Sequence, residues 1–294
     1  MTMFWPNGRL RLMVSSMCNA RCPHCHNEGV SQSSLLMSSH VVQLFSDIAR
    51  EREAPFGTVT FSGGEPLLHP MLADFCRTIS SQAECITVPT NGRILTTPHA
   101  RELALAGVTK FRLDIDPWRL EWNRGRESFF DQVSIEERVN MIRAAGASVA
   151  LNTVLCGYTE ASVSALLEFC ERHQLSIKIF ERVTFQHSTG RFEPNPEMSF
   201  ACLADIIRGR YSFANYTEGD NLNGDVSWQG LPFSLRYCRF LCSRGACKLS
   251  GLRCAPNGKL SVCMNRFGPE QIDEGETIES AIVKIRKVLN RSCS

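Results

Sequence analysis

The sequence has no long apolar run and no excess of charge of one sign. No run reaches the roughly 18 to 20 apolar residues of a membrane-spanning helix. The first residues are interrupted by Pro6, Gly8, Arg9 and Arg11, so they lack the pattern of a signal peptide. Lysine and arginine number 32 against 30 aspartates and glutamates, which gives a net charge of +2 and no basic field for a polyanion. We therefore expect no binding to membranes or to nucleic acid.

Cysteine, in contrast, is abundant, with 14 residues in 294. Two groups stand out in the sequence: Cys18, Cys22 and Cys25, then Cys238, Cys242, Cys247, Cys254 and Cys263. Disulfide scaffolds are usually small, whereas this chain is long enough to bury a hydrophobic core, so the groups favour metal ligation. Thiols in apolar surroundings are expected to be buried, namely Cys76, Cys85, Cys156, Cys170 and Cys202, whereas Cys293 is expected to be free.

Residues 9–182 repeat one pattern: a short apolar or β-branched run, a loop, and a longer segment with helical spacing. The pattern predicts strands at 9–14, 58–61, 85–88, 110–115, 148–155 and 176–180. It predicts helices near 39–52, 71–81, 97–106, 131–145 and 160–173. Strands that alternate with helices indicate an α/β fold with a parallel sheet. Six strands are too few for a closed eight-stranded barrel, which leaves a partial barrel or an open doubly wound sheet.

The pattern ends near residue 183, where glycine, proline and asparagine become frequent. We expect residues 184–235 to form a long linker with one short helix near 199–209. A cysteine-rich segment follows, and an amphipathic helix is expected at 277–289. The predicted domains are therefore 1–183, 184–235 and 236–294.

The strongest chemical signal is the C-x3-C-x2-C spacing of Cys18, Cys22 and Cys25, directly after the first predicted strand. Three thiolates in a short loop suit an iron–sulfur cluster, because the loop can turn all three sulfurs toward a common centre. Three ligands on a four-iron cube leave one iron open. A structural zinc site with His24 or His26 as the fourth ligand is the alternative.

This motif resembles that of the radical S-adenosylmethionine (SAM) superfamily, in which such a loop follows the first strand of a partial (β/α)6 barrel. The resemblance implies a [4Fe-4S] cluster whose open iron binds SAM. It further implies reductive cleavage of SAM to a 5′-deoxyadenosyl radical, which takes hydrogen from a substrate. His24 could then contact SAM or tune the cluster, although packing beside the cysteines explains it equally well.

Further motifs match the same family. Gly63, Gly64, Glu65 and Pro66 resemble its Gly-Gly-Glu-Pro segment, which holds the SAM amino group. Glycines let a backbone approach a ligand closely, and a glutamate accepts hydrogen bonds from an ammonium group.

Polar residues also end the later predicted strands, and the carboxyl ends of parallel strands share one rim. The resemblance implies contacts with the SAM ribose and carboxylate at Thr90, Asn91, Asp114, Asp116 and Asn152. Asp114 departs from the family, whose members often carry serine there. Each residue could instead be an ordinary turn or cap residue.

The segments 116–131, 144–146, 151–154 and 252–263 are similar to the branch that contains the molybdopterin-precursor GTP cyclase and enzymes with SPASM or twitch extensions. Relatives that cyclise GTP carry basic residues where this chain has Met17, Thr58 and Thr60. A triphosphate needs several cationic partners, so we do not expect a GTP cyclase.

The second cysteine group resembles the auxiliary-cluster extensions of that branch. Cys247 and Cys263 are the best candidate ligands, Cys242 comes next, and Cys238 or Cys254 is the possible fourth. Four ligands would close a second [4Fe-4S] cluster, whereas three would leave an iron open for substrate. A zinc ribbon made from four of these thiolates is the alternative.

Together these features predict a radical SAM enzyme that acts on a small molecule, such as a natural-product or cofactor precursor. Peptide modification is the second candidate. Many relatives that modify peptides carry an added leader-recognition domain, whereas only a short segment precedes the first predicted strand here. This favours a small molecule only slightly, because recognition domains can be separate proteins. A non-catalytic zinc or iron–sulfur scaffold is a distant third. We expect an electron donor such as flavodoxin or ferredoxin as partner, and a cytoplasmic location.

Overall fold

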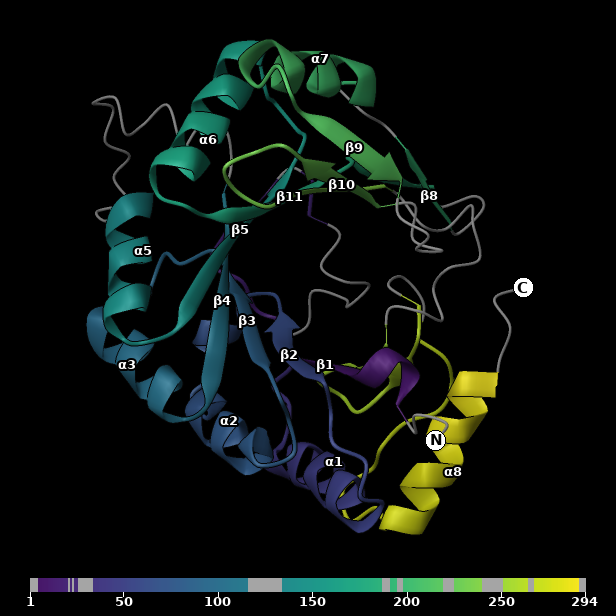
Figure 1. Ribbon diagram of the computed structural model, residues 1–294. Coiled ribbons are helices and arrows are strands. Elements are labelled where there is room, and N and C mark those ends of the chain that lie inside the picture. Colours follow the sequence, from purple (N-terminus) through teal and green to yellow (C-terminus); the bar gives the residue numbers. More distant parts are fainter. Residues whose placement is uncertain are drawn as a thin grey trace. The chain divides into compact units, whose positions relative to one another are not determined.

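The computed structural model describes residues 5–20, 22, 24–25, 34–115, 134–186, 191–194, 198–218, 225–239, 251–263 and 267–290. The chain divides into two compact units, and we describe each by itself. Figure 1 labels their helices and strands. The first unit comprises residues 1–111, 141–148 and 245–294, and the second comprises residues 112–140 and 149–244.

The first unit is built from a parallel sheet and the helices that follow its strands. Its elements are η1 (Pro6–Gly8), β1 (Arg9–Ser15), α1 (Ser39–Glu51), β2 (Thr58–Gly63), η3 (Pro66–Leu68), α2 (Leu72–Ser80), β3 (Ile86–Thr90), α3 (Thr97–Leu105), β12 (Leu252–Cys254), β13 (Leu260–Ser261) and α8 (Ile278–Asn290). β1 lies between β2 and β12 and runs parallel to both, whereas β13 pairs with β12 in the antiparallel sense. The elements β4 (Val108–Asp114), α5 (Ile135–Ala144) and β5 (Ser148–Val154) cross the boundary between the units.

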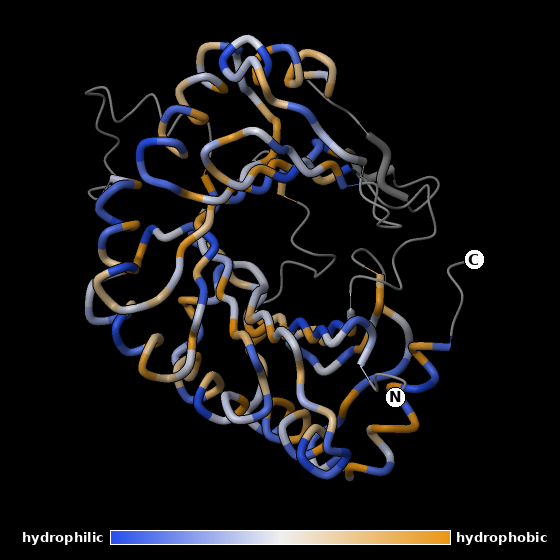
Figure 2. Tube along the Cα trace, in the orientation of Figure 1, coloured by the Kyte–Doolittle hydropathy of each residue, from blue (hydrophilic) through white to orange (hydrophobic). Residues whose placement is uncertain are grey.

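Hydrophobic residues at helical and strand spacing form the core of this unit. In β1, Leu10 and Leu12 are buried, and they pair with Val59 and Phe61 of β2. α1 is amphipathic, because its apolar residues recur every three or four positions and are buried on one side. Hydrophilic and hydrophobic residues alternate along the helices in Figure 2, as this packing requires.

The second unit combines parallel strands with an antiparallel extension. Its remaining elements are α6 (Glu160–Arg172), β6 (Ser176–Phe180), β7 (Val183–Gln186), β8 (Arg191–Pro194), α7 (Phe200–Arg210), β9 (Asn215–Glu218), β10 (Val226–Gln229) and β11 (Leu235–Cys238). β6 runs parallel to β5 on one side and to β11 on the other. β10 joins β11 to β9 through antiparallel pairs, and β7 and β8 form a separate hairpin.

The predicted α/β fold with a mostly parallel sheet is confirmed. All six strands and all the helices predicted from the pattern are present, with ends that differ by a few residues. The stretch 184–235 is more regular than expected. It contains the predicted helix as α7, and it also contains β8 to β10 and most of β7, which were not predicted.

The reason for this difference is a set of aromatic residues spread among turn residues. Ring centroids of Phe200 and Tyr237 lie 5.0 Å apart, and those of Tyr216 and Trp228 lie 5.2 Å apart. These rings bring α7 together with β9, β10 and β11. Strands of four residues between glycines and asparagines are too short for alternation to be recognised in the sequence. The division into domains itself stays a prediction.

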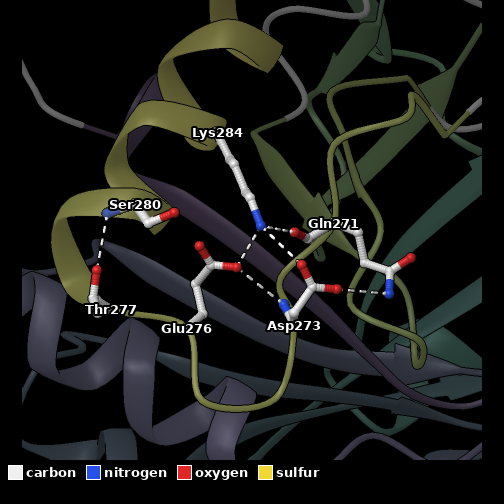
Figure 3. Close-up of polar contacts among 6 residues, drawn as sticks. All are labelled: Gln271, Asp273, Glu276, Thr277, Ser280 and Lys284. Atoms are coloured by element: carbon white, nitrogen blue, oxygen red, sulfur yellow. Dashed lines mark hydrogen bonds and ion pairs between the residues drawn. The ribbon is translucent and has the colours of Figure 1, made fainter.

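The C-terminal helix α8 is held by a lysine that reaches the loop before it (Figure 3). Lys284 Nζ donates to the Gln271 carbonyl oxygen at 2.8 Å and to Asp273 Oδ2 at 3.0 Å, and it also binds Glu276. The side chain of Glu276 is only 5% exposed, and its Oε2 also accepts a hydrogen bond from the Asp273 N–H at 3.2 Å, so Lys284 is its one cationic partner among the contacts in Figure 3. α8 also packs beside α1. Among the described helices, none has both the length and the hydropathy of a membrane span.

We predict that Lys284→Met destabilises the protein by about 1–3 kcal/mol, because it leaves the buried Glu276 carboxylate without its cation. Lys287→Met is the control, since Lys287 lies on the same helix and is exposed. Thermal unfolding followed by circular dichroism measures both. Equal melting temperatures for the two variants would contradict this role of Lys284.

Candidate functional site

The backbone after β2 lies directly against the start of the cysteine loop. The Gly64 N–H donates to the Ser15 carbonyl oxygen at 2.7 Å, and the Glu65 N–H donates to the Met17 carbonyl oxygen at 2.7 Å. A Cβ atom on Gly63 would overlap the Ser15 carbonyl, and one on Gly64 would overlap the Met17 carbonyl. The glycines were expected to bring the backbone close to a ligand. In the structure they bring it close to the chain itself, and the ligand contact stays a prediction.

Glu65 connects the loop after β2 with the loop after β3. Its side chain is almost completely buried. Oε1 accepts hydrogen bonds from the Leu67 N–H at 3.1 Å and from the Thr90 hydroxyl at 2.6 Å. Oε2 accepts a hydrogen bond from the Asn91 N–H at 2.8 Å. A buried carboxylate is stable when several donors compensate its lost hydration, so these contacts fix the charge in place. Pro66 follows as the first residue of η3.

Asn91 holds the cysteine loop from the side of β3. Its Nδ2 donates to Asn19 Oδ1 at 2.8 Å and lies 3.8 Å from Cys18 Sγ, within hydrogen-bonding range for sulfur. Arg93 Nη1 donates to the Asn19 carbonyl oxygen at 3.0 Å. Asn19 and Arg93 were missed by the sequence analysis. The position of Asn19 inside the cysteine motif was the only signal that could have indicated it.

The three cysteines of the motif lie in this one loop. Cys18 and Cys25 are exposed and Cys22 is half-buried. The Cys25 N–H donates to the Cys22 carbonyl oxygen at 3.0 Å, in a turn that contains the half-buried His24. Partial burial raises the pKa of Cys18, and the nearby Glu65 and Cys25 act in the same direction. Among the residues that the structure describes, no three His, Cys, Asp or Glu side chains are gathered around a single metal ion, so the thiols of Cys18, Cys22 and Cys25 would have to draw together to share a cluster.

The donor set fits a cluster bound through thiolates. Cys18 Sγ accepts a hydrogen bond from the Ala20 N–H at 3.4 Å in addition to the contact with Asn91. Donors of this kind stabilise the negative charge of a coordinated sulfur and tune the potential of an iron–sulfur centre. Cys18, Cys22 and Cys25 could therefore bind three irons of a [4Fe-4S] cluster, with Asn91 and the Ala20 amide as supporting donors.

Two predicted site residues lie together in the second unit. Asn152 Nδ2 donates to Asp114 Oδ1 at 3.1 Å, and the Ile115 N–H donates to the Asn152 carbonyl oxygen at 2.9 Å. Asn152 Oδ1 is buried and accepts no hydrogen bond from the described residues, so a ligand hydroxyl or ammonium group could donate to it. Asp116 lies outside the described residues.

The candidate auxiliary ligands are only partly described. Cys254 is fully buried in β12, where burial raises the pKa of its thiol and Sγ contacts the Ala255 carbonyl oxygen at 3.6 Å. Cys263 is half-buried, and its N–H donates to Ser261 Oγ at 2.8 Å. Cys238 ends β11 and is buried, and burial raises its pKa to about 12. Cys242 and Cys247 lie outside the described residues, so the auxiliary cluster stays a prediction.

The remaining cysteines mostly follow the sequence analysis. Cys76, Cys156 and Cys170 are buried as predicted, whereas Cys85 and Cys202 are only half-buried. Both of these thiols lie near polar groups. Thr109 Oγ1 donates to Cys85 Sγ at 3.1 Å, and Cys202 Sγ lies 4.0 Å from Glu160 Oε1. Cys293 lies outside the described residues.

Comparison with known proteins places these observations in a family. Residues 12–170 match the family described as Radical SAM superfamily. The chain is 30% identical over 292 residues to a probable GTP 3',8-cyclase of Archaeoglobus fulgidus, and this match covers 95% of this chain and 94% of the relative.

Two solved structures share the fold. Native anSMEcpe with bound AdoMet has a TM-score of 0.61 at 14% identity, with 97% of this chain and 84% of that chain covered. Streptococcus suis SuiB bound to precursor peptide SuiA has a TM-score of 0.63 at 11% identity, with 93% of this chain covered. This chain spans 64% of the SuiB chain, or somewhat less than two thirds of its length.

We predict that Gly64→Ala lowers the stability by about 1–3 kcal/mol or more, because the new methyl group overlaps the Met17 carbonyl. Gly209→Ala in α7 is the matched control, since no atom lies within 4 Å of a Cβ there. We expect this control to be neutral or slightly stabilising. Urea unfolding of both variants measures the difference, and an unchanged Gly64→Ala would show that the close approach is not required.

We predict that Asn91→Ala weakens iron binding by the cysteine loop about 10- to 100-fold, because it removes a donor that supports a ligand. Iron and sulfide analysis after anaerobic reconstitution at limiting iron measures this effect. Asn140→Ala on the exposed side of α5 is the control. Iron content of Asn91→Ala equal to that of the control would contradict the prediction.

Proposed function

This chain belongs to the Radical SAM superfamily and is a radical SAM enzyme, and we propose that it removes a hydrogen atom from a small organic molecule. The observation that carries the proposal is the arrangement around the cysteine loop. Three cysteines lie in one loop, which Asn91 holds from β3 and which the Gly64–Glu65 backbone holds from β2.

The family implies a [4Fe-4S] cluster and SAM as cofactors. When bound, a cluster reduced by an external donor would supply the one electron needed for reductive cleavage of SAM, and the resulting 5′-deoxyadenosyl group would supply hydrogen-atom abstraction. Cys18, Cys22 and Cys25 bind the cluster in this proposal and leave one iron open. The Gly63–Gly64 backbone and Glu65 shape the place of the SAM amino group. Thr90 acts on the site only through Glu65, because its hydroxyl donates a hydrogen bond to the Glu65 carboxylate.

In the second unit, we assign Asn152 to the binding of SAM through its buried Oδ1. A carbonyl oxygen of this kind accepts from a hydroxyl or an ammonium group. Asp114 accepts a hydrogen bond from the Asn152 amide and so positions Asn152. We do not assign Asp114 to the SAM carboxylate, because the two negative charges would repel each other.

A small-molecule substrate is supported by the relative from Archaeoglobus fulgidus, which matches nearly the whole of both chains and is named for a nucleotide substrate. We do not propose GTP itself, because Met17, Thr58 and Thr60 replace basic residues of the relatives that cyclise it. Peptide modification is the second candidate, supported by the shared fold with SuiB bound to its precursor peptide.

The proposal also covers the type of barrel, the C-terminal extension and the electron donor. We propose a partial (β/α)6 barrel with a C-terminal extension that binds an auxiliary cluster through cysteines of the second group. A flavodoxin or ferredoxin would supply the electron. Iron–sulfur chemistry needs reduced thiols, which agrees with the expected cytoplasmic location.

The test is anaerobic reconstitution with iron and sulfide, followed by reduction in the presence of SAM and mass-spectrometric detection of 5′-deoxyadenosine. We expect the wild type to form this product and the triple variant Cys18→Ala, Cys22→Ala, Cys25→Ala to form none above background. The triple variant should retain about four irons if an auxiliary cluster is present. Cys202→Ala is the control for loss of a thiol elsewhere, and it should retain full activity.

Two results would contradict the proposal. The first is a wild-type protein that takes up iron and sulfide but yields no 5′-deoxyadenosine. The second is a triple variant that forms the product as fast as the wild type, because the radical would then arise at another site.

A further inference from the structure

Arg93 places a positive charge against the cysteine loop, and no described carboxylate neutralises it. The residue follows β3, and its backbone N–H donates to Asn91 Oδ1 at 2.9 Å. Its Nη1 donates at 3.0 Å to the carbonyl oxygen of Asn19, the residue directly after Cys18. In the described part of the chain, the half-buried guanidinium group forms no ion pair, and its buried Nε has no acceptor. Arginines withdrawn from water are normally paired with an anion, so this charge requires an explanation.

The hydrogen bond to Asn19 does not by itself explain a charged residue at this position. A neutral amide group can donate to a backbone carbonyl as well. The loop is also held by other contacts, because Asn91 Nδ2 donates to Asn19 Oδ1 at 2.8 Å and the Glu65 N–H donates to the Met17 carbonyl oxygen at 2.7 Å. What Arg93 adds to these contacts is a permanent positive charge.

This charge becomes important when the loop carries a cluster. Three thiolates bring negative charge to the loop, and one-electron reduction of a [4Fe-4S] cluster adds one more. Opposite charges attract more strongly where water is partly excluded, so a half-buried guanidinium group stabilises the reduced cluster more than the oxidised cluster. Asn91 and the Ala20 amide supply neutral donors to Cys18 Sγ, whereas Arg93 supplies a full charge.

We infer that Arg93 raises the reduction potential of the cluster bound by Cys18, Cys22 and Cys25, so that an external donor reduces it more readily. The inference rests on the proposed function for the identity of the cluster. Arg93 acts through its charge and its place beside the loop, and it neither gives nor takes an electron or a proton. The electron comes from the external donor, which is oxidised as the cluster is reduced.

The experiment measures the midpoint potential of the reconstituted cluster by redox titration, followed by electron paramagnetic resonance in the absence of SAM. The triple cysteine variant is titrated in parallel. A signal that this variant lacks belongs to the cluster of the loop, so the comparison removes the contribution of any auxiliary cluster. Iron and sulfide contents of every variant are measured first, which separates loss of the cluster from a change in its potential.

We expect Arg93→Gln and Arg93→Met to lower the ratio of reduced to oxidised loop cluster at a fixed potential about tenfold. This corresponds to a downward shift of about 59 mV for a one-electron couple. Arg93→Lys keeps the charge and should stay close to the wild-type potential, whereas Arg93→Gln keeps a donor without the charge. Arg101→Gln is the control, because Arg101 is an exposed residue of α3, and it should leave the potential unchanged.

Three results would overturn the inference. The first is a wild-type potential in Arg93→Gln, and the second is a potential of Arg93→Lys as low as that of Arg93→Met. Either result would show that the charge is not what matters. The third is loss of the cluster from Arg93→Gln and Arg93→Lys alike, which would assign Arg93 to holding the loop.

The titration also distinguishes this inference from the proposed function. A potential that follows the charge at Arg93, in a protein that yields no 5′-deoxyadenosine with SAM, would refute the proposed function and leave the inference standing. Product formation by the wild type together with equal potentials in all variants would refute only the inference. A wild-type loop that takes up no cluster would refute both.

Discussion

The cysteine loop depends on the two backbone hydrogen bonds that Gly64 and Glu65 donate to the residues just after β1. They require the backbone of β2 to lie against Ser15 and Met17, at a distance that excludes any side chain at Gly63 or Gly64. This close approach places the Glu65 carboxylate between the loops that follow β2 and β3. The buried charge then holds Thr90 and Asn91 in position, and Asn91 in turn holds the loop with the three cysteines. The position of the cysteine loop therefore depends on two glycines and one buried glutamate.

Much of the fold could be predicted from the sequence, because each βα repeat carries its own signal. Hydrophobic spacing predicted α1 within one residue of its observed end, and β6 was predicted with its observed limits. The strands β7 to β10 were not predicted, because four-residue strands between turn residues carry almost no periodicity. What holds them is contact between distant aromatic residues, such as Phe200 with Tyr237, and such contacts are invisible in a local pattern.

For the candidate site, the sequence correctly indicated the segments that form it. It indicated the contacts of the individual residues less well. Spacing alone identified Cys18, Cys22 and Cys25 as one group, and the glycine motif was found from its place after a strand. The sequence could not show that Glu65 and Asn91 bond to the chain itself, since these contacts depend on the register between β1, β2 and β3.

The account assigns different tasks to the two units. The first holds the cysteine loop, whose thiols suit an iron–sulfur cluster, and the second carries Asn152, whose buried Oδ1 could accept a hydrogen bond from a ligand. The central claim is that Cys18, Cys22 and Cys25 bind a [4Fe-4S] cluster that takes SAM on its open iron. Electron paramagnetic resonance of the reduced protein, recorded with and without SAM, tests this claim most directly. We predict a signal of a reduced four-iron cluster that changes when SAM is added and is missing from the triple cysteine variant. A signal that SAM leaves unaltered, or a protein that binds only zinc through these thiols, would contradict the account.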